Sequence, residues 1–201
     1  MKRVSSIILV VSLAVVPTLG ADTIVLSTNE QHTLTTFDTI PSKDEITSVT
    51  GPDPVARLRD LALSSSTDFG VRLRAIRALP QFCSSIPSCK EQLDHPARLA
   101  VRDVIGTIAF DDRSGQAILE LRAAIEALGV IKSAQQTDVD LLLPFLEHES
   151  RDIRVATARA LRDLCLDTAS QPLRTRYDQE PVASVRLAIS NALGDLDTCS
   201  P

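Results

Sequence analysis

The stretch DIRVATARALRDL at residues 152–164 contains a nine-residue pattern, IRVATARAL, that decides the fold. Two close copies exist, VRLRAIRAL at residues 71–79 and VRLAISNAL at residues 185–193. Each begins with a β-branched residue and Arg and ends in Ala-Leu, and apolar or small residues recur at i, i+4, i+7, i+8 and i+11. This spacing follows the period of an α-helix and not the alternation of a strand. The three stretches therefore predict amphipathic helices.

A fourth and weaker copy, LRAAIEALG at residues 121–129, is one residue shorter at its end. The arginines that follow the first residue of each copy are separated by 50 (122 − 72), 32 (154 − 122) and 32 (186 − 154) residues. A period of roughly 30–40 residues indicates a stack of helical repeats. The first interval is 18 residues (50 − 32) longer than the others, and residues 80–95, PQFCSSIPSCKEQLDH, form a polar insertion that accounts for most of it.

Each copy is interpreted as the second helix of a hairpin. We expect the first helices at residues 53–63, 95–110, 137–149 and 171–180, with Asp53 and Pro54 opening the first and Pro96 the second. Pro144 is expected to kink the third, and the fourth is the shortest. The residues expected to face the core are Val71, Ala75, Leu79, Leu121, Leu128, Ile153, Ala160, Leu161, Val185, Ile189 and Leu193. Alanines among them allow close helix packing.

The pattern Val-Arg-x-x-Ala/Ile-x-x-Ala-Leu, with a following Gly in "ALG" at residues 127–129 and 192–194, resembles the HEAT repeat. It is most similar to the short bacterial repeats that also occur in phycobilisome-lyase-like proteins. The resemblance covers residues 53–196 and implies an all-α fold, a right-handed α-α superhelix of about four hairpins. It also implies that the Arg of a copy pairs with an Asp in the preceding turn, which Asp68 could do for Arg72.

The N-terminus has the layout of a bacterial secretory signal peptide. Lys2 and Arg3 precede an apolar run from Ile7 to Val16, followed by Pro17 and small residues. We expect a signal peptide at residues 1–20, cut after Gly20 or Ala21; the alternative is an uncleaved anchor. The mature protein would then be periplasmic or secreted, with no membrane insertion after cleavage.

Residues 21–51 are expected to form an N-terminal arm or cap, ahead of the repeat domain at residues 52–201. The Thr-rich stretch TIVLSTNEQHTLTTF suggests an extended arm or a strand. Ser42 and Glu45 have the spacing of a capping box and predict a short helix there. Such a helix would shield the apolar end of the stack, because terminal repeats need caps.

The cysteines are four in number: Cys83, Cys89, Cys165 and Cys199. An even count in an exported protein indicates disulfides, and three pairings are possible. Proximity and repeat register favour Cys83–Cys89 and Cys165–Cys199. A zinc site would need closer cysteine pairs with His nearby, so we expect no metal and no cofactor.

Composition argues against several functions. The net charge is −5, and removal of the signal peptide makes it −7 (19 − 26), which disfavours nucleic acid as a partner. Aromatic residues are 3% of the chain, too few for a platform that stacks sugars or nucleotides. Catalytic motifs such as G-x-S-x-G and H-E-x-x-H are absent. We therefore expect no enzyme activity.

The remaining hypothesis is a non-catalytic scaffold for protein–protein interaction in the periplasm or outside the cell. The second helices carry a basic bias that also includes Arg74, Arg77 and Arg159. Arg72, Arg122, Arg154 and Arg186 are the candidate binding residues, as an exposed row on the concave face that contacts a partner with an acidic surface. The competing interpretation makes these arginines internal ion pairs or solvated side chains. The alternative function, by analogy with phycobilisome-lyase-like proteins, is a lyase or cofactor-handling protein.

Overall fold

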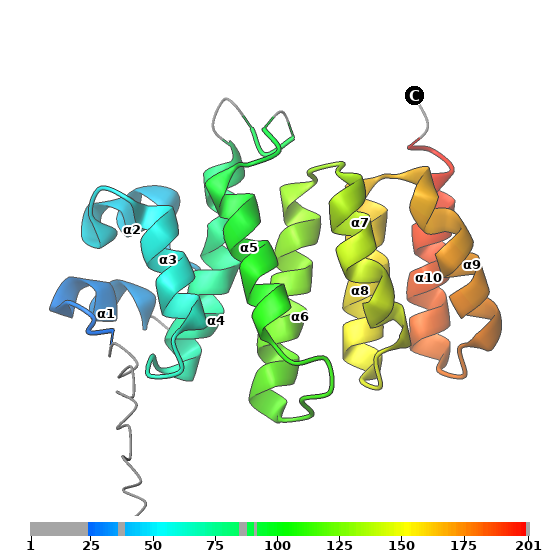
Figure 1. Cartoon of the computed structure of the whole chain (residues 1–201), viewed down its shortest axis with the longest axis horizontal. Helices are drawn as coiled ribbons and strands as arrows, with labels where there is room; N and C mark the ends of the chain where they lie inside the picture. The colour runs from blue at the N-terminus through cyan, green and yellow to red at the C-terminus, as the bar shows by residue number, and fades with distance from the viewer. Residues whose placement is uncertain (1–23, 36–38, 85–87, 91, 200–201) are drawn as a thin grey trace, which may run out of the picture.

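A computed structural model describes residues 24–35, 39–84, 88–90 and 92–199, and this part of the chain is helical and without strands. The repeat region contains four hairpins (Figure 1). Their first helices are α3 (Pro54–Leu63), α5 (Pro96–Thr107), α7 (Gln136–Leu142) and α9 (Ser170–Gln179). Their second helices are α4 (Phe69–Ala78), α6 (Gly115–Ile131), α8 (Arg151–Leu164) and α10 (Ala183–Leu196). The predicted helical solenoid is confirmed.

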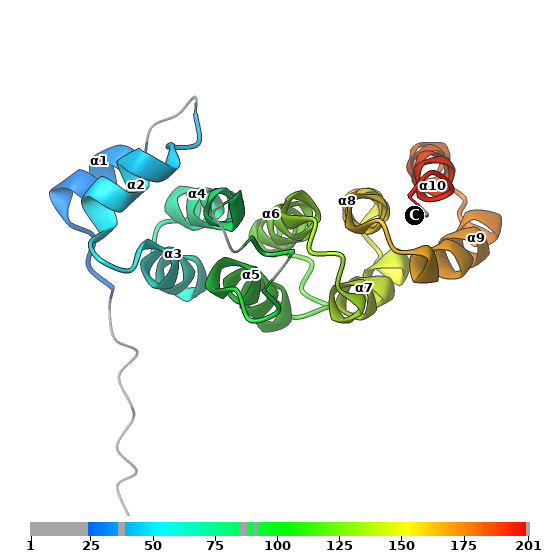
Figure 2. The ribbon, with the colours of Figure 1, turned by 90° about the horizontal axis from the view of Figure 1, so that it is seen from above.

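The hairpins stack side by side in two layers. In Figure 2 the first helices form one row and the second helices the other, and the ends of the stack bend toward the second-helix row. That row is therefore the concave face of the molecule. Three short 3-10 segments, η1 (Leu79–Ser84), η2 (Leu143–Glu147) and η3 (Asp167–Ala169), complete the repeats. At the kink expected near Pro144, the α-helix α7 ends at Leu142 and the 3-10 segment η2 begins at Leu143.

The core is the one that the sequence pattern predicts. Ten of the eleven residues expected to face inward are buried, and Leu193 is partly buried. Helices α6 and α8 lie close together at Gly129, where an added Cβ would lie 2.9 Å from Ala160 Cα. Small residues are required on both helices at this crossing, as expected for Ala160.

The N-terminal segment differs from the prediction in one respect. Residues 28–34 form helix α1 (Thr28–Leu34) and not a strand or an extended arm. Ser27 and Glu30 make a capping box in which each side chain binds the other residue's backbone N–H. Ser27 and Glu30 have the same S-x-x-E spacing as Ser42 and Glu45. The β-branched residues around Ser27 favoured a strand or an extended arm in the prediction, although this spacing is typical of a helix start.

The second predicted helix is confirmed. Helix α2 (Lys43–Thr50) begins with the Ser42–Glu45 capping box. Leu34 of α1 and Ile46 of α2 are fully buried, and both helices lie against the first hairpin at the end of the stack (Figure 1). The two helices cap the apolar end of the solenoid.

Both predicted disulfides form. Cys83 and Cys89 have Cα atoms 5.0 Å apart, and Cys165 and Cys199 have Cα atoms 5.5 Å apart. The first closes a loop of the insertion between the first two repeats. The second joins the C-cap of α8 to the segment after α10, so it ties the last helix to the preceding repeat.

The predicted signal peptide, residues 1–20, lies outside the described residues. Within the part of the chain that the structure describes, no helix combines the length and the apolar character that crossing a membrane requires.

Candidate protein-binding face

The predicted binding residue Arg154 lies inside the protein and not on its concave face. It is 7% exposed and makes a bidentate ion pair with Glu180, with Nε 2.7 Å from Oε2 and Nη2 2.8 Å from Oε1. Its Nη1 donates to the carbonyl oxygens of His148 and Glu149 in the turn before α8. Arg154 therefore joins its own hairpin turn to the next repeat.

Glu180 is the centre of this network. It also accepts hydrogen bonds from Arg176 and from the Val182 backbone N–H, and Arg176 pairs in turn with Glu147. Burial raises the pKa of Glu180, but the hydrogen bonds from Arg154, Arg176 and Val182 outweigh it and hold this pKa at about 2. The carboxylate is thus ionised at any physiological pH.

Arg72 makes the equivalent connection between the first two repeats. Its Nε lies 2.6 Å from Glu120 Oε1 on α6, and Nη1 donates to the Thr67 carbonyl oxygen at 2.9 Å. The expected pairing with Asp68 is wrong, because that carboxylate caps α4 and accepts from the N–H groups of Gly70 and Val71.

Helix α5, the first helix of its hairpin, also carries an arginine that pairs with a carboxylate of the next repeat, and the sequence did not predict this contact. Arg98 of α5 binds both carboxylate oxygens of buried Asp138 in the next repeat at 2.7 Å, and it donates to the Leu93 carbonyl oxygen ahead of its own helix. Arg102 pairs with the same carboxylate. Such arginines are structural links between repeats.

The other two predicted binding residues are more exposed. Arg122 pairs with Glu126 one turn later in α6, at 2.8 Å. Arg186 is exposed and has no ion-pair partner among the described residues. The prediction of an exposed, unpaired row is therefore wrong for Arg72, Arg122 and Arg154, because carboxylates of the same or the next repeat neutralise them.

A different set of charges is available on the concave face. On α4, α6, α8 and α10 every carboxylate has an arginine partner, namely Glu120, Glu126, Asp152, Asp163 and Asp195. Arginines on these helices without an ion pair among the described residues are Arg74, Arg77, Arg159 and Arg186. Described carboxylates outside any ion pair include Asp60, Asp140 and Asp178 on first helices. The uncompensated charge of the second-helix layer is thus positive.

The two central arginines of this set occupy equivalent positions. Arg77 and Arg159 each precede the Ala-Leu of their repeat and are exposed. Beside Arg77 lies an apolar cleft of about 420 Å³. It is lined by Ile40, Arg77, Pro80, Gln81, Ala123, Glu126, Ala127 and Val130. Val130 is 62% exposed there. An apolar cleft bordered by an unpaired guanidinium suits a protein segment that carries both apolar and acidic side chains.

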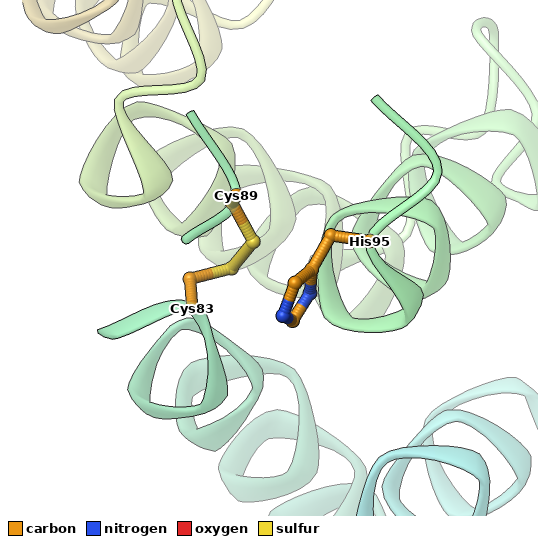
Figure 3. Close-up of side chains that lie close together, drawn as sticks. All are labelled: Cys83, Cys89 and His95. Atoms are coloured by element: carbon orange, nitrogen blue, oxygen red, sulfur yellow. A yellow bond between two sulfur atoms is a disulfide. The ribbon is translucent and has the colours of Figure 1, made fainter. Parts of the chain in front are cut away.

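A second cluster of reactive groups lies at the insertion. His95 caps α5 by accepting the Ala97 N–H at Nδ1, and burial and Lys43 lower its pKa. Its ring faces the Cys83–Cys89 disulfide (Figure 3), and the two sulfur atoms and a ring nitrogen lie within 4.8 Å of one another. Sequence reasoning missed this, although the three residues are evenly spaced as C-x5-C-x5-H.

Known proteins resemble this chain in fold. Residues 114–194, from the N-cap of α6 into α10, match the family described as HEAT repeats. The crystal structure of an engineered protein, a structural genomics target, is similar with a TM-score of 0.51 and 17% identity, over 80% of this chain and 69% of that chain. No curated protein matches the sequence. The family match and the structural likeness support a HEAT-repeat solenoid.

Proposed function

We propose that this protein is a non-catalytic interaction scaffold that acts in the periplasm or outside the cell and binds an acidic protein partner on its concave face. The observation that carries the proposal is the segregation of charge. Each carboxylate on the second helices lies in an ion pair with an arginine, while Arg74, Arg77, Arg159 and Arg186 have no ion pair in the described structure, in a chain whose net charge is −5.

Two further features support it. HEAT-type solenoids offer extended concave surfaces for binding other proteins, and arginine can bind carboxylates in a bidentate manner. The two disulfides are compatible with an oxidising compartment.

Charge reversal at the concave face tests the proposal. The protein, the variant R77E/R159E and the control R59E/R174E are immobilised and exposed to the envelope fraction and culture medium of the source organism. The control changes the net charge equally, but its arginines lie on α3 and α9 in exposed ion pairs. We expect the wild type and the control to capture one shared partner, increasingly weakly as salt is raised, and R77E/R159E to lose it. Equal capture by all three would exclude this face.

A further inference from the structure

The corner where η1, the insertion and α5 meet brings together two thiol sulfurs and one imidazole. Cys83 comes from the end of η1, Cys89 from the turn after it, and His95 from the N-cap of α5 (Figure 3). Cys83 is 8%, Cys89 1% and His95 9% exposed. Among the described residues this is the one group of three such side chains whose potential ligand atoms converge within 4.8 Å.

Cysteine and histidine are the preferred ligands of Zn²⁺, and three protein ligands with an open fourth position are a common zinc arrangement. We propose that reduction of the Cys83–Cys89 disulfide converts this corner into a Cys2His site for Zn²⁺. The disulfide form holds no metal, because both sulfurs are bonded to each other. The inference does not depend on the proposed interaction function.

The chemical step is balanced by a dithiol reductant. The S–S bond between Cys83 and Cys89 breaks as the two sulfurs of the reductant join, and each cysteine sulfur takes one of the two protons that the reductant gives up. Zn²⁺ then replaces those two protons. Two thiolates balance the 2+ charge of the metal, so the filled site is neutral overall, which suits a buried corner.

The geometry requires only small movements. Zn–S and Zn–N bonds of about 2.3 and 2.0 Å in a tetrahedron place ligand atoms roughly 3.5–3.8 Å apart. The three atoms already lie within 4.8 Å of one another, and the Cα atoms of the cysteines are 5.0 Å apart. The sulfurs must separate after reduction, and the ring must approach them.

One existing contact is lost when metal binds. His95 Nδ1 accepts the Ala97 N–H at 3.3 Å. A neutral imidazole that binds zinc through Nε2 carries its proton on Nδ1, and one that binds through Nδ1 has no lone pair left there. Either way the α5 cap opens. Faster hydrogen exchange at the Ala97 amide, at one equivalent of metal, is therefore a signature of His95 as a ligand.

The experiment uses a C165S/C199S background, so that reduction affects one disulfide only. The protein is reduced, freed of reductant without oxygen, and titrated with Co²⁺ and then Zn²⁺. Co²⁺ serves as the optical probe because its absorption reports tetrahedral geometry and thiolate ligands. We expect one metal ion per chain, thiolate charge-transfer absorption, displacement of Co²⁺ by Zn²⁺, and no binding by the oxidised protein.

Two variants decide the outcome. His95→Asn keeps a good helix cap but cannot reach the metal, and it should weaken binding by more than the roughly 10–100-fold that an outer-shell partner contributes. The reduced chain with C83S/C89S in place of C165S/C199S is the control for unspecific thiol binding. Absence of stoichiometric Co²⁺ binding, equal binding by the control, or unchanged affinity in His95→Asn would each overturn the proposal, while circular dichroism verifies that the variants are folded.

Discussion

Arg154 and Arg186 occupy the same position in consecutive repeats, yet one is buried and the other is exposed. Arg154 is 7% exposed and clamped by Glu180, whereas Arg186 has no ion pair among the described residues. The difference arises from the neighbouring repeat. Glu180 belongs to the repeat after α8, and the described structure contains no repeat after α10.

One motif position therefore has two physical roles. For Arg72 and Arg154, inside the stack, a carboxylate of the next repeat compensates the loss of hydration, whereas Arg122 pairs with Glu126 of its own helix. At the end of the stack the same side chain stays in water. This contrast between the interior and the ends of the solenoid can be tested by substitution, from the largest expected effect to the smallest.

Removing the interior arginine should have the largest effect. Arg154→Ala leaves Glu180 buried with Arg176 as its one remaining arginine partner, and breaking a buried pair costs roughly 3–5 kcal/mol. Arg186→Ala should change the free energy of unfolding by less than about 0.5 kcal/mol, as for other exposed positions. Urea denaturation measures both. Similar losses of unfolding free energy in the two variants would show that the motif position, and not the presence of a following repeat, determines the role of the arginine.

Opening the disulfide at the C-terminal end should come next. In the chain-entropy model a loop of about 35 residues, Cys165–Cys199, contributes roughly 4 kcal/mol, and a loop of about 7 residues, Cys83–Cys89, roughly 2 kcal/mol. C165S/C199S should therefore lower the melting temperature more than C83S/C89S. Calorimetry of both variants measures this, and non-reducing peptide mapping verifies the pairing. The reverse order would mean that the C-terminal helix needs no covalent tie.

Acid should weaken the interior joint. The pKa of Glu180 is about 2 in the folded protein and near 4.5 without its partners. Because the folded protein has the lower carboxyl pKa, the ionised carboxylate stabilises the fold at pH values above the pKa of the unfolded state. This stabilisation, here on the order of 3 kcal/mol, is lost as pH falls from about 5 to 2. Glu180→Gln should reduce the slope of stability against pH in this window, measured by urea unfolding at several pH values. A slope equal to that of the wild type would contradict the role of this carboxylate.

The fold was readable from the sequence because helical period and repeat spacing depend on local residues. The positions of Val71, Ile153 and Val185 in the core followed from the pattern alone. The burial and pairing of Arg72 and Arg154 could not be predicted in this way, because their partners Glu120 and Glu180 lie 48 and 26 residues further along the chain. The sequence placed Arg74, Arg77 and Arg159 on the second helices, but it did not separate the arginines without an ion pair from the paired ones, because that distinction requires the positions of all neighbouring carboxylates.

Packing between repeats can be tested at the crossing of α6 and α8. Ala160→Leu and Gly129→Ala both add atoms where the two helices leave no room for them. A Cβ added at Gly129 would already lie 2.9 Å from Ala160 Cα. Overpacking costs typically about 1–3 kcal/mol. Gly194→Ala is the matched control, since an added Cβ there meets nothing within 4 Å. Chemical denaturation should show a loss at residues 129 and 160 only; a stable Gly129→Ala variant would show that the two helices can separate at little cost.

The smallest effect is expected at the N-terminal end, where apolar packing and hydrogen bonds, and no disulfide, hold the cap of the solenoid. Ser27→Ala removes the acceptor for the Glu30 N–H at the start of α1, a loss of about 1 kcal/mol. Glu30 stays paired with Arg57 at 2.6 Å, so α1 should fray locally while the first hairpin remains intact. Hydrogen exchange by mass spectrometry distinguishes the two regions: α1 should exchange faster, with α3 unchanged. Faster exchange in α3 as well would show that the helical cap and the first hairpin open as one unit.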